Sequence, residues 1–324
     1  MIYEENGRIV RGVGGLYEIL LDKGDTLLSG RVVASRAKGN FRHEGVSPLV
    51  GDRVRVQYDD SAVARYTAAQ PPKNDDGGGV VIEEILPRAN ALIRPPMANL
   101  GILFITFAAA KPAPVTETID KLIAIAEHNG IEPVPVICKS DVDPDRAAEL
   151  AEIYRHAGFT VFSLSAARSE GVEELRAWIN ENLGGRVAAF AGASGVGKST
   201  LMNALYPSLG LVTGEISAKI ARGKHTTRRV ELYPVSGGFV ADTPGFSMLD
   251  FVRFDFFKKE NLPLAMREFL PYIGACRYTK CTHTKEQGCA ILDAVKAGEI
   301  APSRHQGFLA MYEALKNKHD WSKK

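Results

Sequence analysis

Residues 187–205 read VAAFAGASGVGKSTLMNAL, and this stretch decides the fold of the region around it. Its centre, GASGVGKS at 192–199, matches the phosphate-binding pattern G-x-x-x-x-G-K-[ST] at every fixed position. The apolar residues 187–191 predict a buried strand, and residues 200–205 predict a helix. Because the motif requires a strand before the loop and a helix after it, we expect an α/β domain that binds a nucleotide.

The glycine loop has the chemistry of a phosphate site. Its backbone N–H groups can wrap a diphosphate, and the following helix N-terminus adds positive potential. We expect Lys198 to reach the β and γ phosphates and the Ser199 hydroxyl to ligate magnesium. The alternative is a glycine-rich turn without a ligand. The predicted nucleotide contacts in this loop are Gly192, Ala193, Ser194, Gly195, Val196, Gly197, Lys198, Ser199 and Thr200.

A second apolar strand, residues 238–241, leads into ADTPG at 241–245. At this place P-loop proteins carry an Asp that holds magnesium and a Gly whose N–H meets the γ phosphate, which predicts these roles for Asp242 and Gly245. Between the two motifs lies GKHTTR at 223–228, where a mobile loop can present a threonine hydroxyl to the metal. Thr227 is the first candidate and Thr226 the second, and a simple turn is the alternative. The predicted magnesium residues are Ser199, Thr227 and Asp242.

Phe246 stands after Gly245, where Ras-like enzymes have a glutamine that orients the attacking water. Phenylalanine cannot hydrogen-bond to water, so we expect the protein on its own to hydrolyse the bound nucleotide slowly. His225 is the nearest internal candidate for positioning water, and a loop histidine that faces RNA or solvent is the alternative.

Two segments upstream of the loop indicate guanine recognition. Guanine binders use Asn-Lys-x-Asp at the end of a strand, and CKSD at 138–141 follows the predicted strand 133–138. Asp141 can accept from the two donors on the guanine edge, and Lys139 can cover the ring. Cys138 replaces Asn and offers only weak hydrogen bonding, so we expect reduced affinity. The following strand, 160–164, leads into SLSA at 163–166, which resembles the short Ser-Ala segment that supports the base through a backbone N–H in such proteins. The predicted base contacts are Cys138, Lys139, Ser140, Asp141, Ser165 and Ala166.

The C-terminal region carries a cluster of metal ligands. Cys276, Cys281, His283 and Cys289 lie within 14 residues, with the spacing C-x4-C-x-H-x5-C. Three thiolates and one imidazole form a closed structural zinc site, which has no open position for catalysis. Reduced cysteines beside an ordinary histidine are the alternative.

Residues 1 to about 70 alternate short β-rich runs with turns and show no good helical period, which predicts a small β-barrel. The polar segment 71–79 is expected to be an exposed excursion near the barrel's end. Basic and acidic residues nearly balance in this region, but the stretch 31–55 is locally basic. Basic residues around an aromatic ring suit an OB-type surface for RNA, and a solvated strand face is the alternative. The candidate RNA contacts are Arg31, Arg36, Lys38, Phe41 and Arg42.

The base-recognition segments come before the glycine loop, whereas most GTPases have the reverse order, so the domain is predicted to be circularly permuted. With the barrel before it and the Cys/His cluster after it, nearly the whole chain resembles the ribosome small subunit-dependent GTPase A family. The resemblance includes KGNFR at 38–42, VGD at 50–52 and AN at 98–99, and it departs at Cys138, where the family usually has Asn. It implies GTP hydrolysis stimulated by the small ribosomal subunit, a role in late assembly of that subunit, an OB domain that binds rRNA, and GTP/GDP, Mg2+ and one structural Zn2+ as ligands.

Composition agrees with a folded multidomain chain of 324 residues, because 45% are hydrophobic and 24% charged. A net charge of +2 does not by itself indicate a nucleic-acid binder. The longest apolar run, residues 100–110, is too short to cross a bilayer, and the N-terminus lacks the pattern of a secretory signal. We therefore expect a cytoplasmic, monomeric protein without a membrane partner.

Together these features predict a multidomain protein with an OB-fold barrel at 1–87, a permuted P-loop GTPase domain at 88–249 and a helical zinc-binding domain at 250–324. Two other functions remain open. One is an enzyme that transfers a phosphoryl group to a small molecule, although no acceptor pocket is recognisable. The other is an RNA-binding module with a vestigial nucleotide domain, which intact Lys198, Ser199 and Asp242 argue against.

Overall fold

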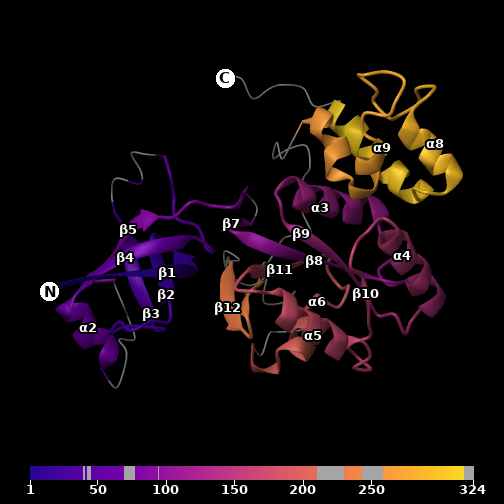
Figure 1. The fold of residues 1–324 in the computed structure, drawn as a ribbon. Helices are drawn as coiled ribbons and strands as arrows, with labels where there is room; N and C mark the ends of the chain where they lie inside the picture. The colour runs from indigo at the N-terminus through magenta and orange to yellow at the C-terminus, as the bar shows by residue number, and fades with distance from the viewer. Residues whose placement is uncertain are drawn as a thin grey trace. The chain divides into compact units, whose positions relative to one another are not determined.

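The computed structural model describes residues 1–38, 41, 45–68, 77–93, 95–209, 230–242 and 258–316, with the backbone alone at 209 and 242 (Figure 1). The chain forms two compact units, which are described separately. The first contains Met1–Gly101, Leu183–Ala189 and Thr227–Gly245, and the second contains Ile102–Asn182, Phe190–Thr226 and Phe246–Lys324.

The first unit begins with a closed five-stranded barrel. Its strands follow the order β1-β2-β3-β5-β4, and β4 pairs back to β1. Only the β3–β5 contact is parallel. Inward residues alternate with outward ones along β4, because successive side chains of a strand point to opposite faces. The predicted barrel is confirmed, with strands β1 (Ile2–Val13), β2 (Leu16–Leu21), β3 (Val32–Ala37), β4 (Arg53–Asp59) and β5 (Val80–Ile85).

One helix lies within the barrel region, and the sequence did not predict it. α2 (Asp60–Thr67) begins after Asp59, whose carboxylate accepts from the Ala62 N–H at 3.0 Å. It buries only Ala62 and Tyr66, which is too few positions for a visible helical period. The polar excursion comes before β5, the last barrel strand along the chain, so it lies near the end of the barrel as expected; residues 71–76 of it lie outside the described residues.

The remainder of the first unit extends the sheet beyond the barrel. β11 (Val187–Ala191) pairs in parallel with β13 (Gly238–Asp242), and β12 (Glu231–Val235) lies antiparallel between β13 and β1. A two-stranded hairpin, β6 (Ala91–Ile93) and β7 (Pro96–Ala98), follows the barrel. The Arg8 guanidinium lies 5.1 Å from the Phe239 ring centre and donates to the Gly51 carbonyl at 3.1 Å. Barrel and β13 thus share a side-chain contact as well as β1–β12 pairing.

The second unit contains the parallel strands β10, β9 and β8, in that order. Its strands β8 (Leu100–Ala108) and β9 (Glu132–Cys138) are almost entirely buried, as expected for parallel strands covered on both faces. The predicted strand at 160–164 is shorter, with β10 at Phe162–Ser163. The helices of this α/β layer are α3 (Thr116–His128), α4 (Pro144–His156), α5 (Val172–Asn182) and α6 (Lys198–Leu205), which is followed by the short η1 (Pro207–Leu209).

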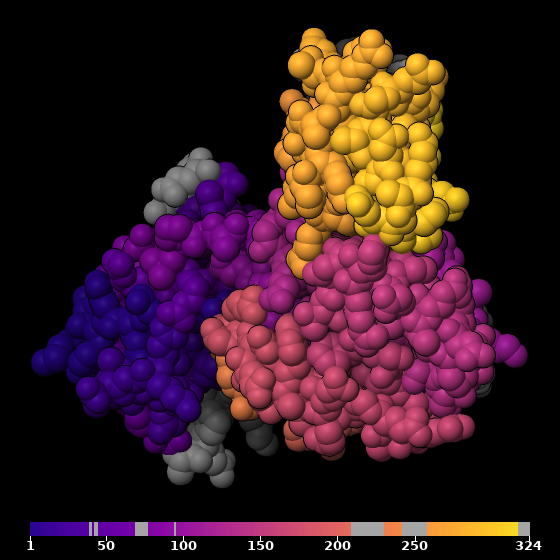
Figure 2. Space-filling model, turned by 45° about the vertical axis from the view of Figure 1, so that its right-hand side comes forward, coloured from indigo at the N-terminus to yellow at the C-terminus, as the bar shows by residue number. Residues whose placement is uncertain are grey.

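The C-terminal region is helical and packs directly on α3. Figure 2 shows the orange and yellow C-terminal segment resting on the magenta segment of the same unit, and α9 and η3 both contact α3. Ala124 and Ile125 of α3 belong to the hydrophobic core of this region. The two parts therefore share a core. The C-terminal elements are η3 (Lys259–Ala265), η4 (Arg267–Tyr272), α8 (Ala290–Ala297) and α9 (Pro302–Lys316).

A buried ionic network strengthens the contact between α9 and α3. Arg304 of α9 is 1% exposed and pairs with Asp120 of α3, while its Nε donates to Glu268 of η4 at 2.7 Å. The Tyr154 hydroxyl of α4 donates to the same Asp120 oxygen at 3.2 Å. Because buried charges are costly unless they are paired, this network fixes how α9 lies on the α/β layer.

No helix within the described ranges is both long and apolar enough to span a bilayer.

Candidate nucleotide and metal sites

The predicted strand, glycine loop and helix are confirmed by β11 and α6. The loop follows Ala191, and α6 begins at Lys198. Gly195 and Gly197 have φ values of +83° and +106°, a region that residues with a Cβ rarely adopt. The Lys198 Nζ atom lies 3.4 Å from the Gly192 carbonyl oxygen. The helix N-terminus and the lysine are thus both placed beside the loop, as phosphate binding requires.

Lys139 joins the base-recognition segment to the glycine loop. Its Nζ donates to the Gly195 carbonyl oxygen at 2.7 Å and to the Lys111 carbonyl oxygen at 2.7 Å. Lys139 itself has a φ of +57°, which is uncommon for a residue with a side chain. Two segments that are far apart in sequence, 138–141 and 192–199, therefore form one site in the second unit.

Asp141 is arranged to accept hydrogen bonds. A hydrogen bond from the Ser165 side chain, and to a smaller degree the charge of Arg168, holds the pKa of Asp141 below its usual value. The Arg168 Nε atom lies 3.5 Å from Asp141 Oδ2. Ser165 is buried, and the Ser140 N–H donates to the Leu164 carbonyl oxygen at 3.2 Å, which brings the two predicted base segments together. The carboxylate is ionised at neutral pH and can take two donors from a guanine edge. No motif points to Arg168, so sequence reasoning missed it.

Cys138 stands where the Asn-Lys-x-Asp segment of guanine binders has Asn, and it lacks the polar amide of that residue. Its side chain is 3% exposed, and burial raises the pKa of its thiol to about 12. The Sγ atom lies 4.0 Å from the Val136 carbonyl oxygen, and the Cβ would be 3.7 Å from a Cβ added at Gly197. The side chain thus packs against the glycine loop as a small apolar group.

Five predicted residues of the nucleotide site lie at or beyond the limits of the described residues. Asp242 ends β13, with only its backbone described, and the parallel register sets Ala241 beside Ala189 of β11. Outside the described residues are His225, Thr226, Thr227 and Gly245. Their assignments stay predictions.

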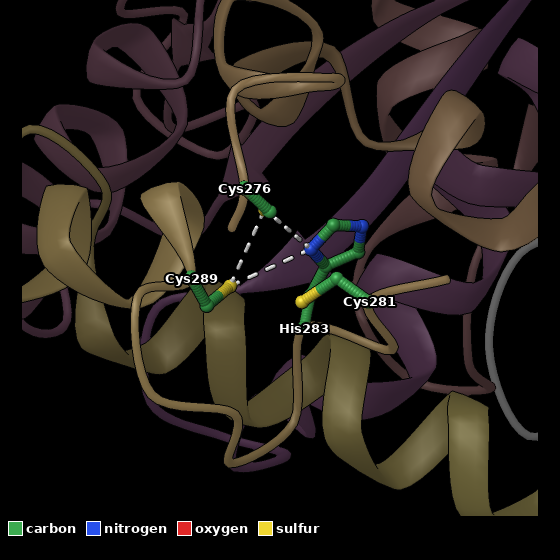
Figure 3. A group of neighbouring side chains, drawn as sticks. All are labelled: Cys276, Cys281, His283 and Cys289. Atoms are coloured by element: carbon green, nitrogen blue, oxygen red, sulfur yellow. Dashed lines mark hydrogen bonds between the residues drawn. The ribbon is translucent and has the colours of Figure 1, made fainter. Parts of the chain in front are cut away.

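The four predicted zinc ligands converge in the C-terminal region (Figure 3). Their ligand atoms all lie within 4.8 Å of one another. Cys276 Sγ and Cys289 Sγ are 3.9 Å apart, and His283 Nδ1 lies 3.6 Å from Cys276 Sγ and 3.5 Å from Cys289 Sγ. Tetrahedral zinc with ordinary bond lengths requires separations of about 3.8 Å between two sulfurs and about 3.6 Å between sulfur and nitrogen. The donor set and its spacing therefore fit zinc.

Residues around the cluster, which sequence reasoning did not identify, hold the ligand loop. The His305 Nε2 atom lies 2.9 Å from the His283 carbonyl oxygen. Glu286 accepts from the Thr282 hydroxyl and from the N–H groups of Thr284 and Lys285 at 3.0 and 3.1 Å. These bonds, led by the one from Thr282, outweigh burial and lower the pKa of Glu286 to about 2. The loop is thus shaped by its own hydrogen bonds, and such support orients metal ligands.

Two of the basic residues predicted to contact RNA have partners within the barrel. Lys38 pairs with Glu83, and Arg31 donates to the Tyr66 carbonyl oxygen at 2.6 Å. Arg36 is exposed, and Arg42 lies outside the described residues. Phe41 is only 7% exposed, so its ring is not offered for stacking as the sequence suggested, because an apolar ring is stabilised by burial. Of the predicted RNA contacts among the described residues, Arg31 and Arg36 are the two that are exposed.

The order of these segments defines a class of protein. A P-loop that follows its base-recognition segments in the chain, behind a closed five-stranded barrel, is the arrangement of a circularly permuted GTPase. Family models agree, because RsgA GTPase matches residues 85–252 and RsgA N-terminal domain matches residues 6–64. The chain belongs to the RsgA GTPase family.

Individual relatives extend this match over nearly the whole chain. A protein of Caldanaerobacter subterraneus named "Small ribosomal subunit biogenesis GTPase RsgA" is 38% identical over 96% of both chains. One of Geobacillus thermodenitrificans with the same name is 38% identical over 96% of this chain and 98% of its own. YjeQ from Thermotoga maritima has a similar crystal structure, with a TM-score of 0.78, 30% identity, and coverage of 98% of this chain and all of that one. YloQ, whose structure is described as a circularly permuted GTPase, gives a TM-score of 0.75 at 30% identity, covering 98% of this chain and 96% of that one.

Proposed function

We propose that this protein hydrolyses GTP to GDP and phosphate while it is bound to the small ribosomal subunit, and that it acts in late assembly of that subunit. One observation carries the nucleotide part. The Lys139 ammonium bonds to the Gly195 carbonyl oxygen, so the P-loop and the segment that ends in Asp141 form a single site. The names of the relatives, which call them small ribosomal subunit biogenesis GTPases, support the ribosomal part.

Each part of the site has a proposed role. The glycine loop and Lys198 bind the phosphates, and Asp141 selects guanine through its ionised carboxylate. Ser199, Asp242 and Thr227 would hold Mg2+, which neutralises charge on the phosphates when bound. The Gly245 N–H would meet the γ phosphate. His225 is the proposed internal group that positions water.

The Cys/His cluster is proposed to hold one structural Zn2+. Three sulfurs and one imidazole nitrogen fill a tetrahedron, so no ligand position is left for substrate. Metal binding then stabilises the fold of the C-terminal region. The barrel is proposed to contact rRNA, with Arg31 and Arg36 as exposed basic residues. We further propose that the protein is a cytoplasmic monomer.

The test is phosphate release from GTP by the purified protein with small subunits, with large subunits and with neither. We expect slow release alone and clear stimulation by small subunits only. Lys198→Ala is the matched control, because it removes the phosphate contact, and it should abolish the stimulated rate. Equal rates in all three mixtures would contradict the proposal.

A further inference from the structure

β8 contains one polar side chain within an otherwise apolar strand. Residues 100–108 read LGILFITFA, and Thr106 is 1% exposed. Valine has the same shape and suits a buried strand better, because a buried hydroxyl is costly unless it is hydrogen-bonded. The buried hydroxyl of Thr106 is therefore expected to have a hydrogen-bond partner.

That partner is the start of the phosphate-binding loop. Thr106 Oγ1 donates to the carbonyl oxygen of Ala191, the last residue of β11, at 2.7 Å. A Cβ atom on Gly192 would collide with both the carbonyl oxygen and the hydroxyl of Thr106. The first glycine of the loop thus lies directly against Thr106, and the close approach explains why this position is glycine.

The bond to Ala191 belongs to a wider pattern in the loop. A phosphate cradle needs its N–H groups turned inward, so its carbonyl groups must find partners outside. Four such partners are seen: Thr106 for Ala191, the Lys198 ammonium for Gly192 at 3.4 Å, the Lys139 ammonium for Gly195 at 2.7 Å, and the Leu201 N–H for Gly197 at 2.8 Å. Thr106 is the member of this set that comes from the neighbouring strand and that no nucleotide-binding motif includes.

We propose that Thr106 is a positioning residue of the nucleotide site, whose hydroxyl holds the first turn of the P-loop in its phosphate-binding shape. It touches the loop backbone and acts on the nucleotide through Ala191 and Gly192. The proposal rests on the proposed function, because it assumes that this loop binds the phosphates of GDP and GTP.

The test compares Thr106→Val, which keeps the shape and removes the hydroxyl, with Thr106→Ser, which keeps the hydroxyl. Binding of a fluorescent GDP analogue, the 31P NMR shift of the GDP β-phosphorus and thermal unfolding are measured for each full-length protein. Loss of one hydrogen bond to a buried acceptor predicts about tenfold weaker GDP binding for Thr106→Val. The serine variant should stay within about threefold of wild type. The β-phosphorus shift should change in the valine variant alone.

Ser35→Ala is the matched control, because it removes another buried hydroxyl, one that donates to the Val80 carbonyl oxygen in the barrel at 3.1 Å. It should lower thermal stability without changing GDP affinity, which separates positioning from general destabilisation. Thr106→Ala serves if the valine variant does not fold, with the same expected loss. Unchanged affinity and NMR shift on loss of the hydroxyl, or equal losses for serine and valine, would overturn the positioning role alone. A wild-type protein that binds no GDP would instead overturn the proposed function.

Discussion

Replacing Arg304 with methionine tests how firmly the C-terminal region is attached to the α/β layer. The side chains of Arg304, Asp120 and Glu268 are 1%, 1% and 5% exposed. Arg304→Met keeps the length of the apolar stem but leaves two carboxylates buried beside each other without a cation. Removing one partner of a buried pair typically costs about 3–5 kcal/mol, so we expect a loss of that size in the free energy of unfolding.

The pH dependence of this loss has a definite sign. Burial raises the pKa of Asp120 to about 6 even with Arg304 beside it. Without the guanidinium the folded-state pKa of Asp120 rises further, and an acid whose pKa is raised by folding destabilises the fold above that pKa. Protonation relieves the penalty as the pH falls. The difference between variant and wild type should therefore be larger at pH 8 than at pH 5.

Urea unfolding followed by circular dichroism at both pH values, with hydrogen exchange of α3 and α9, measures the effect. Lys316→Met is the matched control on the same helix, because Lys316 and Glu313 form an exposed pair, with side chains 54% and 58% exposed. Exposed pairs contribute about 0–1 kcal/mol. If Arg304→Met lowers the free energy of unfolding by no more than Lys316→Met does, the structural role of the network is refuted.

Three further changes address the two sites. Asp141→Asn should weaken GTP binding far more than binding of xanthosine triphosphate, because the amide offers a donor to guanine N1–H; equal losses in a competition assay would remove Asp141 from base recognition. Cys138→Asn should tighten GDP and GTP together by about 1 kcal/mol if one ordinary hydrogen bond is regained, as measured by calorimetry; unchanged affinities would show that another group compensates. Chelation of zinc, or Cys281→Ala, should unfold the C-terminal region locally while GDP binding persists; metal analysis that finds no zinc in the purified protein would exclude this site.

Local patterns predicted those parts of the molecule that depend on neighbouring residues in the chain. The glycine loop, the strand that ends at Cys138 and the Cys/His spacing each have a fixed local signature, and β11, β9 and the convergent cluster follow it. The sequence did not predict α2 and β12, because each is short and buries few residues and so gives no clear hydrophobic period.

Contacts between distant segments could not be read from the sequence. Arg304 and Asp120 are 184 residues apart, and nothing in either local pattern indicates that they meet. Phe41 shows the same limit, because a phenylalanine among basic residues suits a stacking surface and a core position equally well. Thr106 was overlooked for a related reason, since its partner belongs to a strand 85 residues further along the chain.

The proposal that this protein is a GTPase acting on the ribosome is tested most directly by one measurement. This is the affinity of the protein for small ribosomal subunits in the GTP-analogue state and in the GDP state. Coupling between nucleotide state and subunit binding of about 1–3 kcal/mol corresponds to a 5- to 150-fold difference in affinity. We expect small subunits to bind the form loaded with a non-hydrolysable GTP analogue more tightly than the GDP form by a factor in that range. Large subunits should show no such difference. Equal affinity of small subunits for the two forms would contradict the account.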